Sequence, residues 1–285
     1  RPAGLGWAVV GGAPARLPDR RRRAALSARP VVDGGGSALV GGGPRVERLD
    51  LAGVGLHDDL ALDLHRRRQL AAGVGELGGQ NLIAHVKTHK SEAVARRQVE
   101  LGIHDFKCAT LKELEMVLQA GARKAILSYP QGQEIKVERL CDLTVSYPDA
   151  WIAAIVSSPF HLNVLATVAT RRKQSLGVML DLDAGMHRTG IGFGKDATKL
   201  YQEIDAHTFL QPYGFHLYDG HDNYTDVNER AAVAKLHIES LQEFQQQIES
   251  AGMPVPCVVA GGSWSFPYYA RTQGMYGSPG TFIYW

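Results

Sequence analysis

A lysine closes a short apolar run in the stretch AHVKTHK, residues 84–90. His85 lies two positions before Lys87, and in a strand two such side chains point to the same face. Burial on that face disfavours the ammonium form and lowers the pKa of a lysine from its usual value of about 10.4. Lys87 therefore indicates either a neutral amine that forms a Schiff base with a carbonyl compound or a side chain that reaches out to solvent.

Two further stretches combine acids with a base or an arginine. DLDAGMHRTGIG places Arg188 in a glycine-bounded loop, where a fixed cation could steer a carboxylate or a phosphate. A structural pair with Asp181 or Asp183 is the alternative. YDGHDN contains His221, whose ordinary pKa near neutrality suits general acid–base catalysis, and a solvated loop is the alternative there.

The stretch AGGS, residues 260–263, follows the last strand-like run. Gly261 and Gly262 would let a phosphate group approach the backbone N–H groups, as happens after the final strands of many barrel enzymes, although such a turn can also be an ordinary loop. An amine nucleophile, a phosphate cradle and a histidine base on one rim together suggest pyridoxal phosphate as a cofactor.

The elements that must position these residues alternate from residue 82 onward. Runs rich in Val, Ile, Leu and Ala are followed by segments with helical spacing, and Ser91, Gly121 and Gly252 are typical of helix ends. The strand-like runs are LIAHVK, DFKCAT, AILSYP, AWIAAIVSS, LGVMLDLDAG, PYGFHLYDG and PCVVAGGS. This alternation predicts an α/β fold, a parallel (β/α)₈ TIM barrel, with one more strand ahead of the strand that carries Lys87.

A barrel of this kind builds its active site where the strands end. Polar residues collect at those places in the sequence. They are Lys87, Cys108, Tyr129, Ser157, Asp181, Asp183, Tyr218, Asp219, His221, Gly261, Gly262 and Ser263.

Composition limits the class of protein. The chain has 285 residues and a net charge of +2 with interleaved signs, so neither a nucleic acid nor a membrane surface is an expected partner. No apolar stretch reaches the roughly 18 residues of a membrane span. Cys108, Cys141 and Cys257 are far apart and form no CxxC pair, which argues against a disulfide framework and a structural zinc site and indicates a cytoplasmic protein.

Residues 1–78 differ from the rest of the chain. Before about residue 79 there is no Lys, Ile, Phe, Tyr, Asn, Thr, Met or Cys, and residues 1–79 hold 16 of the 32 glycines. Neither a helical nor a strand period runs through it. It is interpreted as an atypical leader, either disordered or translated from a shifted reading frame.

Several motifs of the chain resemble, in the same order, the D-threonine aldolase-like and D-serine dehydratase-like enzymes of the alanine racemase type, which are fold-type III pyridoxal phosphate enzymes. They are HVKTHKSEAVARRQ, FKCATLKELEMVLQAG, DLDAGMHRTGIG, FHLYDGHDN, GGSWSFP and GSPGTFIYW. The resemblance covers about residues 81–285. It implies a cofactor-binding barrel over residues 79–270, a C-terminal β-domain that begins at 271–285 and is truncated here, and a homodimer.

The resemblance also implies roles for single residues. Lys87 matches the Schiff-base lysine, Arg188 the arginine beside the cofactor, and Tyr218 a residue that contacts the cofactor. His221 matches the base near the substrate hydroxyl. Gly261, Gly262 and Ser263 match the phosphate loop. Where the family usually has an Arg-Pro pair before the histidine of the lysine motif, this chain has Ile83 and Ala84.

The implied activity is that of a pyridoxal phosphate-dependent lyase that cleaves D-threonine-like substrates to glycine and an aldehyde. The alternatives are a D-serine dehydratase, which releases pyruvate and ammonia, and a barrel that binds the cofactor without turnover. A barrel that binds a phosphorylated metabolite is a further possibility. A divalent metal (Mn, Mg or Zn) is expected only in a full-length form, and no metal ligand is assigned in this chain.

Overall fold

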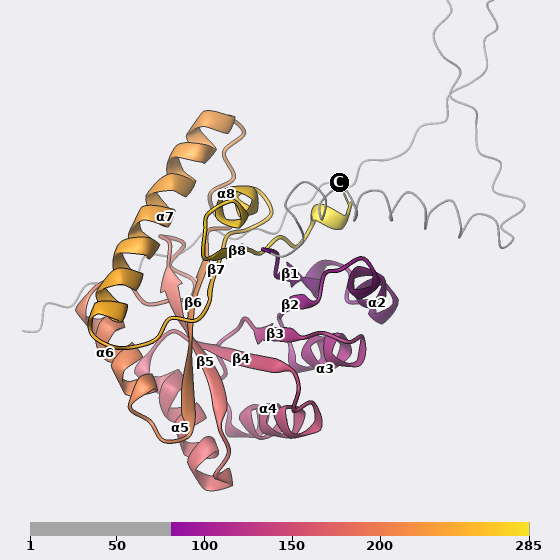
Figure 1. Cartoon of the computed structure of the whole chain (residues 1–285), viewed down its shortest axis with the longest axis vertical. Helices are drawn as coiled ribbons and strands as arrows, with labels where there is room; N and C mark the ends of the chain where they lie inside the picture. The colour runs from indigo at the N-terminus through magenta and orange to yellow at the C-terminus, as the bar shows by residue number, and fades with distance from the viewer. Residues whose placement is uncertain (1–80, 285) are drawn as a thin grey trace, which may run out of the picture. The chain divides into compact units, whose positions relative to one another are not determined.

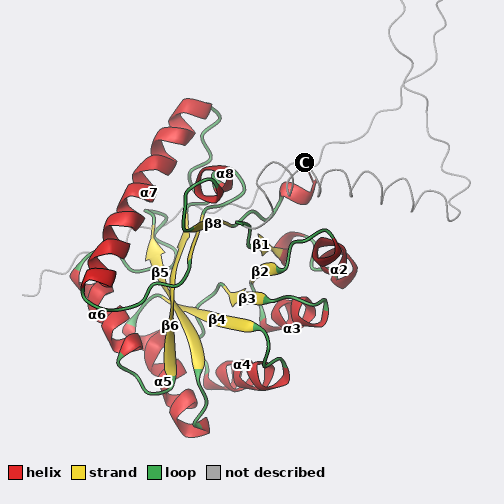
Figure 2. Cartoon of the chain, viewed as in Figure 1, coloured by secondary structure: helices red, strands yellow, loops and turns green. Residues whose placement is uncertain are grey.

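A computed structural model describes residues 81–284, which alternate between strands and helices (Figures 1 and 2). The strands are β1 Ala84–His85, β2 Asp105–Cys108, β3 Lys124–Leu127, β4 Trp151–Val156, β5 Leu176–Asp183, β6 Leu210–Tyr218, β7 Val258–Ala260 and β8 Met275–Gly277. The predicted leader, residues 1–78, lies outside the described residues.

Helices follow the strands and lie around the outside of the sheet (Figure 2). The α-helices are α2 Glu92–Glu100, α3 Leu111–Gln119, α4 Glu134–Ser146, α5 Pro159–Arg172, α6 Lys195–Asp205, α7 Val227–Ser250 and α8 Phe266–Ala270, and the short 3₁₀ helices are η1 Val86–Thr88 and η2 Phe282–Tyr284. Ser91 is the N-cap of α2 as predicted, since its hydroxyl accepts a hydrogen bond from the backbone of Val94. Across residues 81–284, no helix has both the length and the apolar character needed to span a membrane.

The strands form one sheet in chain order, and every pairing is parallel. The two ends of this sheet also meet. Leu82 forms a parallel bridge with Gly277, and the backbone N–H of His85 donates to the carbonyl of Pro279 at 2.8 Å. The predicted (β/α)₈ barrel is therefore confirmed.

The position of the eighth strand differs from the prediction. The sequence predicts one more strand ahead of the strand that leads to Lys87. In the described residues the strand that leads to Lys87 is itself the first, β1, and the eighth strand of the sheet is instead β8, Met275–Gly277. This strand has three residues, too few for a legible period. It falls within the range 271–285, which the resemblance assigns to the start of the next domain, so the barrel sheet continues into that range.

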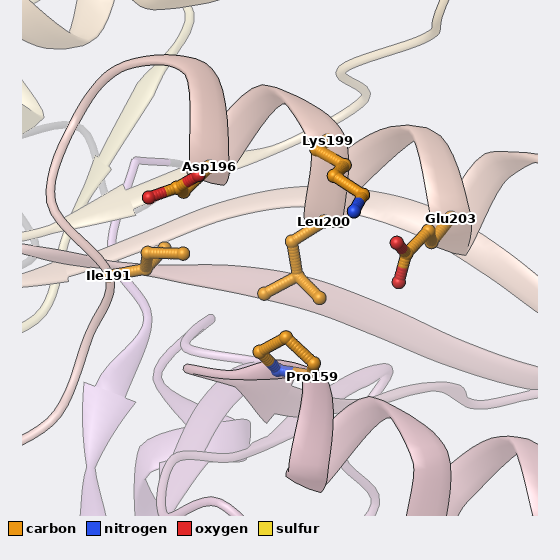
Figure 3. Close-up of a pocket in the computed structure, with 6 residues that line it drawn as sticks. All are labelled: Pro159, Ile191, Asp196, Lys199, Leu200 and Glu203. Atoms are coloured by element: carbon orange, nitrogen blue, oxygen red, sulfur yellow. The ribbon is translucent and has the colours of Figure 1, made fainter. Parts of the chain in front are cut away.

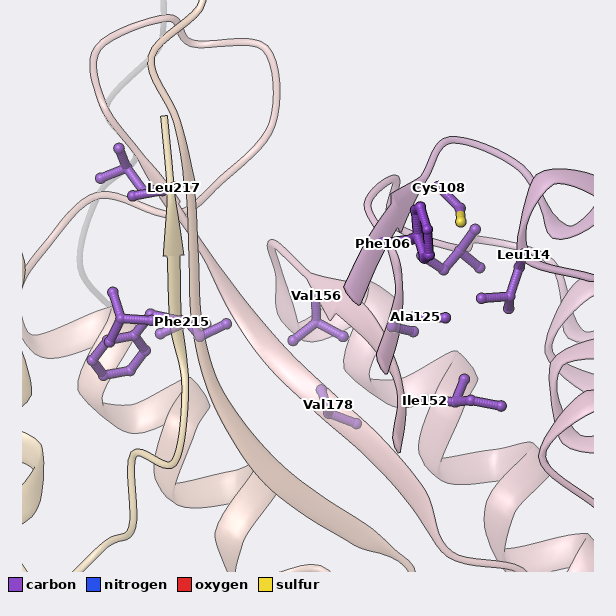
Figure 4. Packing of buried hydrophobic residues seen from close by; sticks show 14 of the residues in the cluster. Phe106, Cys108, Leu114, Ala125, Ile152, Val156, Val178, Phe215 and Leu217 are labelled. Carbon is purple, nitrogen blue, oxygen red and sulfur yellow. The ribbon is translucent and has the colours of Figure 1, made fainter. Parts of the chain in front are cut away.

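Alternation along the strands separates two apolar cores. One core lies between the strands and the helices and includes Phe106, Val178 and Phe215 (Figure 4). The other contains Ile83, Ile126, Ala153, Ile155, Met179, Cys257 and Val259, which alternate with residues of the first core. The second cluster therefore fills the inside of the barrel.

A bulge in β6 changes which residues face inward. The pairing with β5 shifts between Val178 and Met179, so that Tyr213 is an extra residue on β6. Tyr213 packs against the inner core and stacks on Trp151 at a ring distance of 4.1 Å. Beyond the bulge, Phe215 faces the outer core, which leaves the next position, His216, on the inner face.

Gly214 allows this bulge, because its φ is +104° and a Cβ atom would lie 1.9 Å from the carbonyl oxygen of Cys257. Gly102 offers a matched control, with a φ of +93° and open space around it. We expect Gly102→Ala to cost about 1–2 kcal/mol of unfolding free energy from backbone strain alone. Gly214→Ala should cost at least about 2 kcal/mol more because of the clash. Urea unfolding of both variants checks this, and equal losses would contradict it.

Candidate functional site

A small pocket opens at the carboxyl ends of the strands. Its lining residues come from five parts of the barrel rim. They are His85, Lys87, Lys107, Ser128, Tyr129, Arg188, His216 and Tyr218. The free space among them is about 220 Å³, counting the part that is open to solvent. The lining residues include no carboxylate but three basic side chains, those of Lys87, Lys107 and Arg188, so the pocket suits an anionic ligand.

Lys87 lies in the 3₁₀ turn directly after β1, and its side chain is half-buried. Its Nζ atom is 5.1 Å from the centre of the Tyr218 ring. Burial lowers the pKa of Lys87, the nearby Arg188 lowers it further, and Glu113 opposes them. Lys87 is therefore an amine whose neutral form is more accessible than that of an exposed lysine.

The ring of Tyr218, called the platform below, lies next to the side chains of Lys87, Lys107 and Arg188. The guanidinium carbon of Arg188 is 4.8 Å from its ring centre and 5.4 Å from that of Tyr129, so Arg188 contacts two aromatic rings. The Tyr218 ring lies across Gly220, where a Cβ atom would be 2.1 Å from the phenol oxygen. Arg188 forms no ion pair within residues 81–284, since Asp181 and Asp183 bond to other groups.

A chain of hydrogen bonds crosses the inside of the barrel beneath this platform. Lys107 lies on β2, only 2% exposed, and its Nζ atom is 3.4 Å from Nε2 of His216. His216 and Asp181 are partners in the β5–β6 register, and His216 Nδ1 is 2.6 Å from the carboxylate of Asp181. The hydroxyl of Ser157 donates to the second oxygen of that carboxylate at 2.9 Å.

These hydrogen bonds between Lys107, His216 and Asp181 are consistent with one set of proton positions. Burial lowers the pKa of His216, and Lys107 lowers it further against the opposing effect of Asp181. A neutral His216 donates from Nδ1 to Asp181, which leaves Nε2 to accept from Lys107. Burial and the charge of Lys87 lower the pKa of Lys107 to about 7, against the opposing charges of Asp219 and Asp181.

His85 supports Lys107 from the neighbouring strand. Its Nδ1 atom lies 2.8 Å from the carbonyl oxygen of Lys107, so this nitrogen carries the proton. Burial strongly lowers the pKa of His85, and the charges of Lys107 and Lys87 lower it further. His85 is therefore a neutral donor that orients β2, and it lines the same pocket as Lys87, as their spacing predicts.

The predicted phosphate loop lies beside the pocket. Gly261 has a φ of +91°, and a Cβ atom on Gly262 would be 3.4 Å from the ring of Tyr218, which places this turn behind the platform. The hydroxyl oxygen of Ser263 accepts hydrogen bonds from the backbone of Gly280 at 3.2 Å and of Thr281 at 3.0 Å. Two backbone N–H groups and a hydroxyl therefore meet at this turn, where they are hydrogen-bonded to one another.

His221 is half-exposed in the loop after β6 and does not line the pocket. Its Nε2 atom is 3.5 Å from one oxygen of the buried Asp222, and His237 of α7 contacts the other oxygen at 2.8 Å. A Cβ atom on Gly185 would be 3.4 Å from His221 Nε2, so the ring also borders the loop after β5. Asp222 thus fixes the loop of His221 to helix α7.

Residues 62–285 match the family described as "Alanine racemase, N-terminal domain". The chain belongs to this family. Among curated proteins, it is 23% identical to 3-hydroxy-D-aspartate aldolase of Paracoccus denitrificans, over 76% of this chain and 57% of that protein. It is 26% identical to D-threo-3-hydroxyaspartate dehydratase of a Delftia species, over 69% of this chain and 52% of that protein. The chain spans about half the length of these relatives.

Solved structures show the same fold. D-threonine aldolase from Filomicrobium marinum matches with a TM-score of 0.69 and 22% identity, over 76% of this chain and 59% of that one. An alanine racemase of Clostridium difficile matches with a TM-score of 0.62 and 13% identity, over 78% of this chain and 59% of that one. The alanine racemase-like barrel predicted by resemblance is thereby confirmed.

The structure brings Lys87, Arg188 and Tyr218 together in one pocket, as the strand-end rule predicts. The rule is wrong for Cys108. Its side chain faces α3 and the outer core, where Figure 4 shows it near Leu114, and burial raises the pKa of its thiol well above the usual value. Period-2 alternation puts its neighbour Lys107 on the inner face instead. A charged residue between Phe106 and Cys108 is the signal that identifies Lys107.

Two other observations limit the site. No group of three or more His, Cys, Asp or Glu side chains in the described part of the chain could hold a metal ion.

A second hollow lies between the start of α5 and helix α6, lined by Pro159, Ile191, Asp196, Lys199, Leu200 and Glu203 (Figure 3). None of the predicted site residues lines it, so the pocket at the strand ends remains the candidate site.

The buried Lys107 predicts how stability depends on pH. Its folded-state pKa of about 7 is below the unfolded value of about 10.4, so between these pH values the unfolded chain binds more protons and stability rises with pH. Below about pH 7 both states are protonated, and the cost of the buried charge is fully present. Lys107→Met should remove a slope of up to about 1.4 kcal/mol per pH unit.

Urea unfolding of the wild type and Lys107→Met at several pH values from 6 to 10 measures this difference. Lys112→Met is the control, because Lys112 is exposed on α3 and, among the described residues, pairs with Glu115 at 3.2 Å. A wild-type slope that is unchanged in Lys107→Met would show that Lys107 keeps an ordinary pKa.

Proposed function

We propose that this chain carries the pyridoxal phosphate site of a lyase that cleaves D-β-hydroxy-α-amino acids to glycine and an aldehyde. The observation that supports this most is the pairing of Lys87, whose pKa is lowered, with Arg188 over one tyrosine ring. The relatives named as aldolases support the substrate class. Because the chain spans about half of their length, the activity is a proposal for the protein as a whole.

The residues present fit this cofactor. An amine with an accessible neutral form can bond to its aldehyde, and the pocket lining has no carboxylate to repel its anionic groups. The backbone N–H groups of Gly280 and Thr281 donate to the hydroxyl of Ser263, and a bound phosphate would replace that hydroxyl as their acceptor. The N–H groups of Gly261 and Gly262 are paired with Leu217 and Ser265. Bound there, the cofactor supplies an electron sink for the bond that breaks.

In this proposal each side chain has a separate task. Lys87 would hold the cofactor by a covalent bond to its aldehyde. Arg188, held between the rings of Tyr129 and Tyr218, is a fixed cation that binds a carboxylate or a phenolate oxygen. Tyr218 is a flat surface for the ring of the cofactor.

His221 is the proposed base that removes the proton from the β-hydroxyl group. A histidine suits this role at neutral pH, and the carboxylate of Asp222 at 3.5 Å can orient its ring. Loss of that proton turns the C–O bond of the substrate into the carbonyl of the leaving aldehyde as the Cα–Cβ bond breaks.

A dehydratase is the second candidate, supported by the 26% identity to D-threo-3-hydroxyaspartate dehydratase. Lys87 would then remove the α-proton, and the products would be an oxo acid and ammonia. The cationic pocket favours a substrate with a second carboxylate in either case. Incubation with D-3-hydroxyaspartate, D-threonine and D-serine, followed by separate assays for glycine, aldehyde and ammonia, distinguishes the two reactions.

A divalent metal and a homodimer belong to the proposal as well. Loss of activity with EDTA and its return with Mn²⁺ would support the metal. The mass of the cofactor-loaded protein in solution would decide the oligomeric state.

The lysine assignment makes a direct prediction. The protein mixed with pyridoxal phosphate should develop the visible absorption band of a lysine-linked cofactor, and borohydride followed by peptide mass mapping should find the label on Lys87. Lys87→Ala should abolish the band. Lys90→Ala is the matched control, since Lys90 is 63% exposed and pairs with Glu113, and it should retain the band. A label on Lys90, or a folded protein without a band, contradicts the proposal.

The role of His221 predicts a loss of turnover without a loss of cofactor. His221→Gln should lower kcat by about 10²–10⁴-fold and leave the lysine-linked band intact. His207→Gln is the control, because His207 lies between α6 and β6, at the opposite end of the strands. Unchanged turnover in His221→Gln would exclude this histidine as the base.

A further inference from the structure

Lys107 is a buried amine to which the proposed function gives no task. It lines the same pocket as Lys87, and the two Nζ atoms lie 5.6 and 5.1 Å from the centre of the same Tyr218 ring. Both amines therefore border one pocket and one ring, and the charge of Lys87 is close enough to lower the pKa of Lys107. Water in the pocket between them would provide the path for a proton.

The partners of Lys107 are arranged to receive a positive charge. Nε2 of His216 accepts from the amine, and Nδ1 of the same ring donates to the carboxylate of Asp181 at 2.6 Å. Ser157 holds the other oxygen of that carboxylate. A proton that arrives on Lys107 is thus compensated through two hydrogen bonds by a buried negative charge.

We propose that Lys107 accepts the proton that Lys87 must lose before its amine can attack an aldehyde. The proton moves from the ammonium of Lys87 to the neutral amine of Lys107, and the lone pair freed on Lys87 forms the new C–N bond. Lys107 does not bond to the aldehyde and acts only through Lys87. This inference rests on the proposed cofactor chemistry of Lys87.

The charges around Lys107 are compatible with this role. The groups that face it are His85 on β1, Lys87 on η1, Asp181 on β5, His216 and Tyr218 on β6, Asp219 after β6 and Arg188 in the loop after β5. Burial and Lys87 lower the pKa of Lys107 to about 7, so a substantial fraction of this amine is neutral near neutral pH. An acceptor with a pKa near the working pH is effective at moving protons.

The test follows the rate of bond formation, which does not depend on turnover. Cofactor-free protein is mixed rapidly with pyridoxal phosphate at pH values from 6 to 9, and the visible band is recorded. The wild-type rate should show an inflection near pH 7. Lys107→Met should lower the rate at pH 8 at least tenfold and remove this inflection, while the final label remains on Lys87.

Two further variants separate proton transfer from a structural role. Lys107→Arg retains a long cationic side chain but cannot accept a proton, so it should be as slow as Lys107→Met. If Lys107→Met does not fold, Lys107→Arg carries the test. Lys112→Met, on the exposed face of α3, should behave as the wild type.

The outcomes are distinct. Wild-type rates and an unchanged pH profile in Lys107→Arg or Lys107→Met overturn the inference and leave the proposed cofactor site intact. Full rates in Lys107→Arg with slow bond formation in Lys107→Met show that charge alone is needed and also overturn it. If the wild type itself forms no bond at Lys87, the proposed function fails, and the inference fails with it.

Discussion

A buried amine inside a barrel of apolar residues needs hydrogen-bond partners, and a compensating charge whenever it is protonated, and the top of this barrel is organised around that requirement. Below it, the interior is filled by residues such as Ile126, Ile155 and Met179. One layer higher, Lys107 is linked through His216 to Asp181. The platform of Tyr218 and the amine of Lys87 lie over this layer, so the site rests on a floor that is polar, buried and internally hydrogen-bonded.

This floor depends on backbone geometry as much as on side chains. The extra residue Tyr213 and the positive φ of Gly214 shift the alternation of β6 by one position. Without the bulge, the alternation that turns Tyr213 inward would turn Phe215 inward too and His216 outward. The pairing of His216 with Asp181 therefore requires a glycine two residues before the histidine.

The sequence predicts the parts of this molecule that have a local signal. Alternating apolar runs identify seven strands, and the lysine after an apolar strand, the arginine loop and the YDGH stretch identify Lys87, Arg188 and Tyr218. Lys107 and His216 lie inside strands. The charge of Lys107 between two apolar neighbours is a local signal, but the partners of both residues are fixed by the register between distant strands. The three-residue β8 escapes prediction because pairing with distant residues, and no local pattern, makes it a strand.

The closure of the barrel has a consequence for folding. β1 has two residues, and its edge is held by the segment around residues 277–279, about 195 positions away, where the hydroxyl of Ser278 donates to the carbonyl of Ile83. Contacts between such distant residues form late, because a long loop must close first. During synthesis Lys87 leaves the ribosome before every other residue proposed for the cofactor, yet the strand beside it is complete only after β8 exists. Burial and the nearby Arg188 lower the pKa of Lys87, and both require the folded chain, so an unfolded, unfinished chain presents Lys87 as an ordinary lysine.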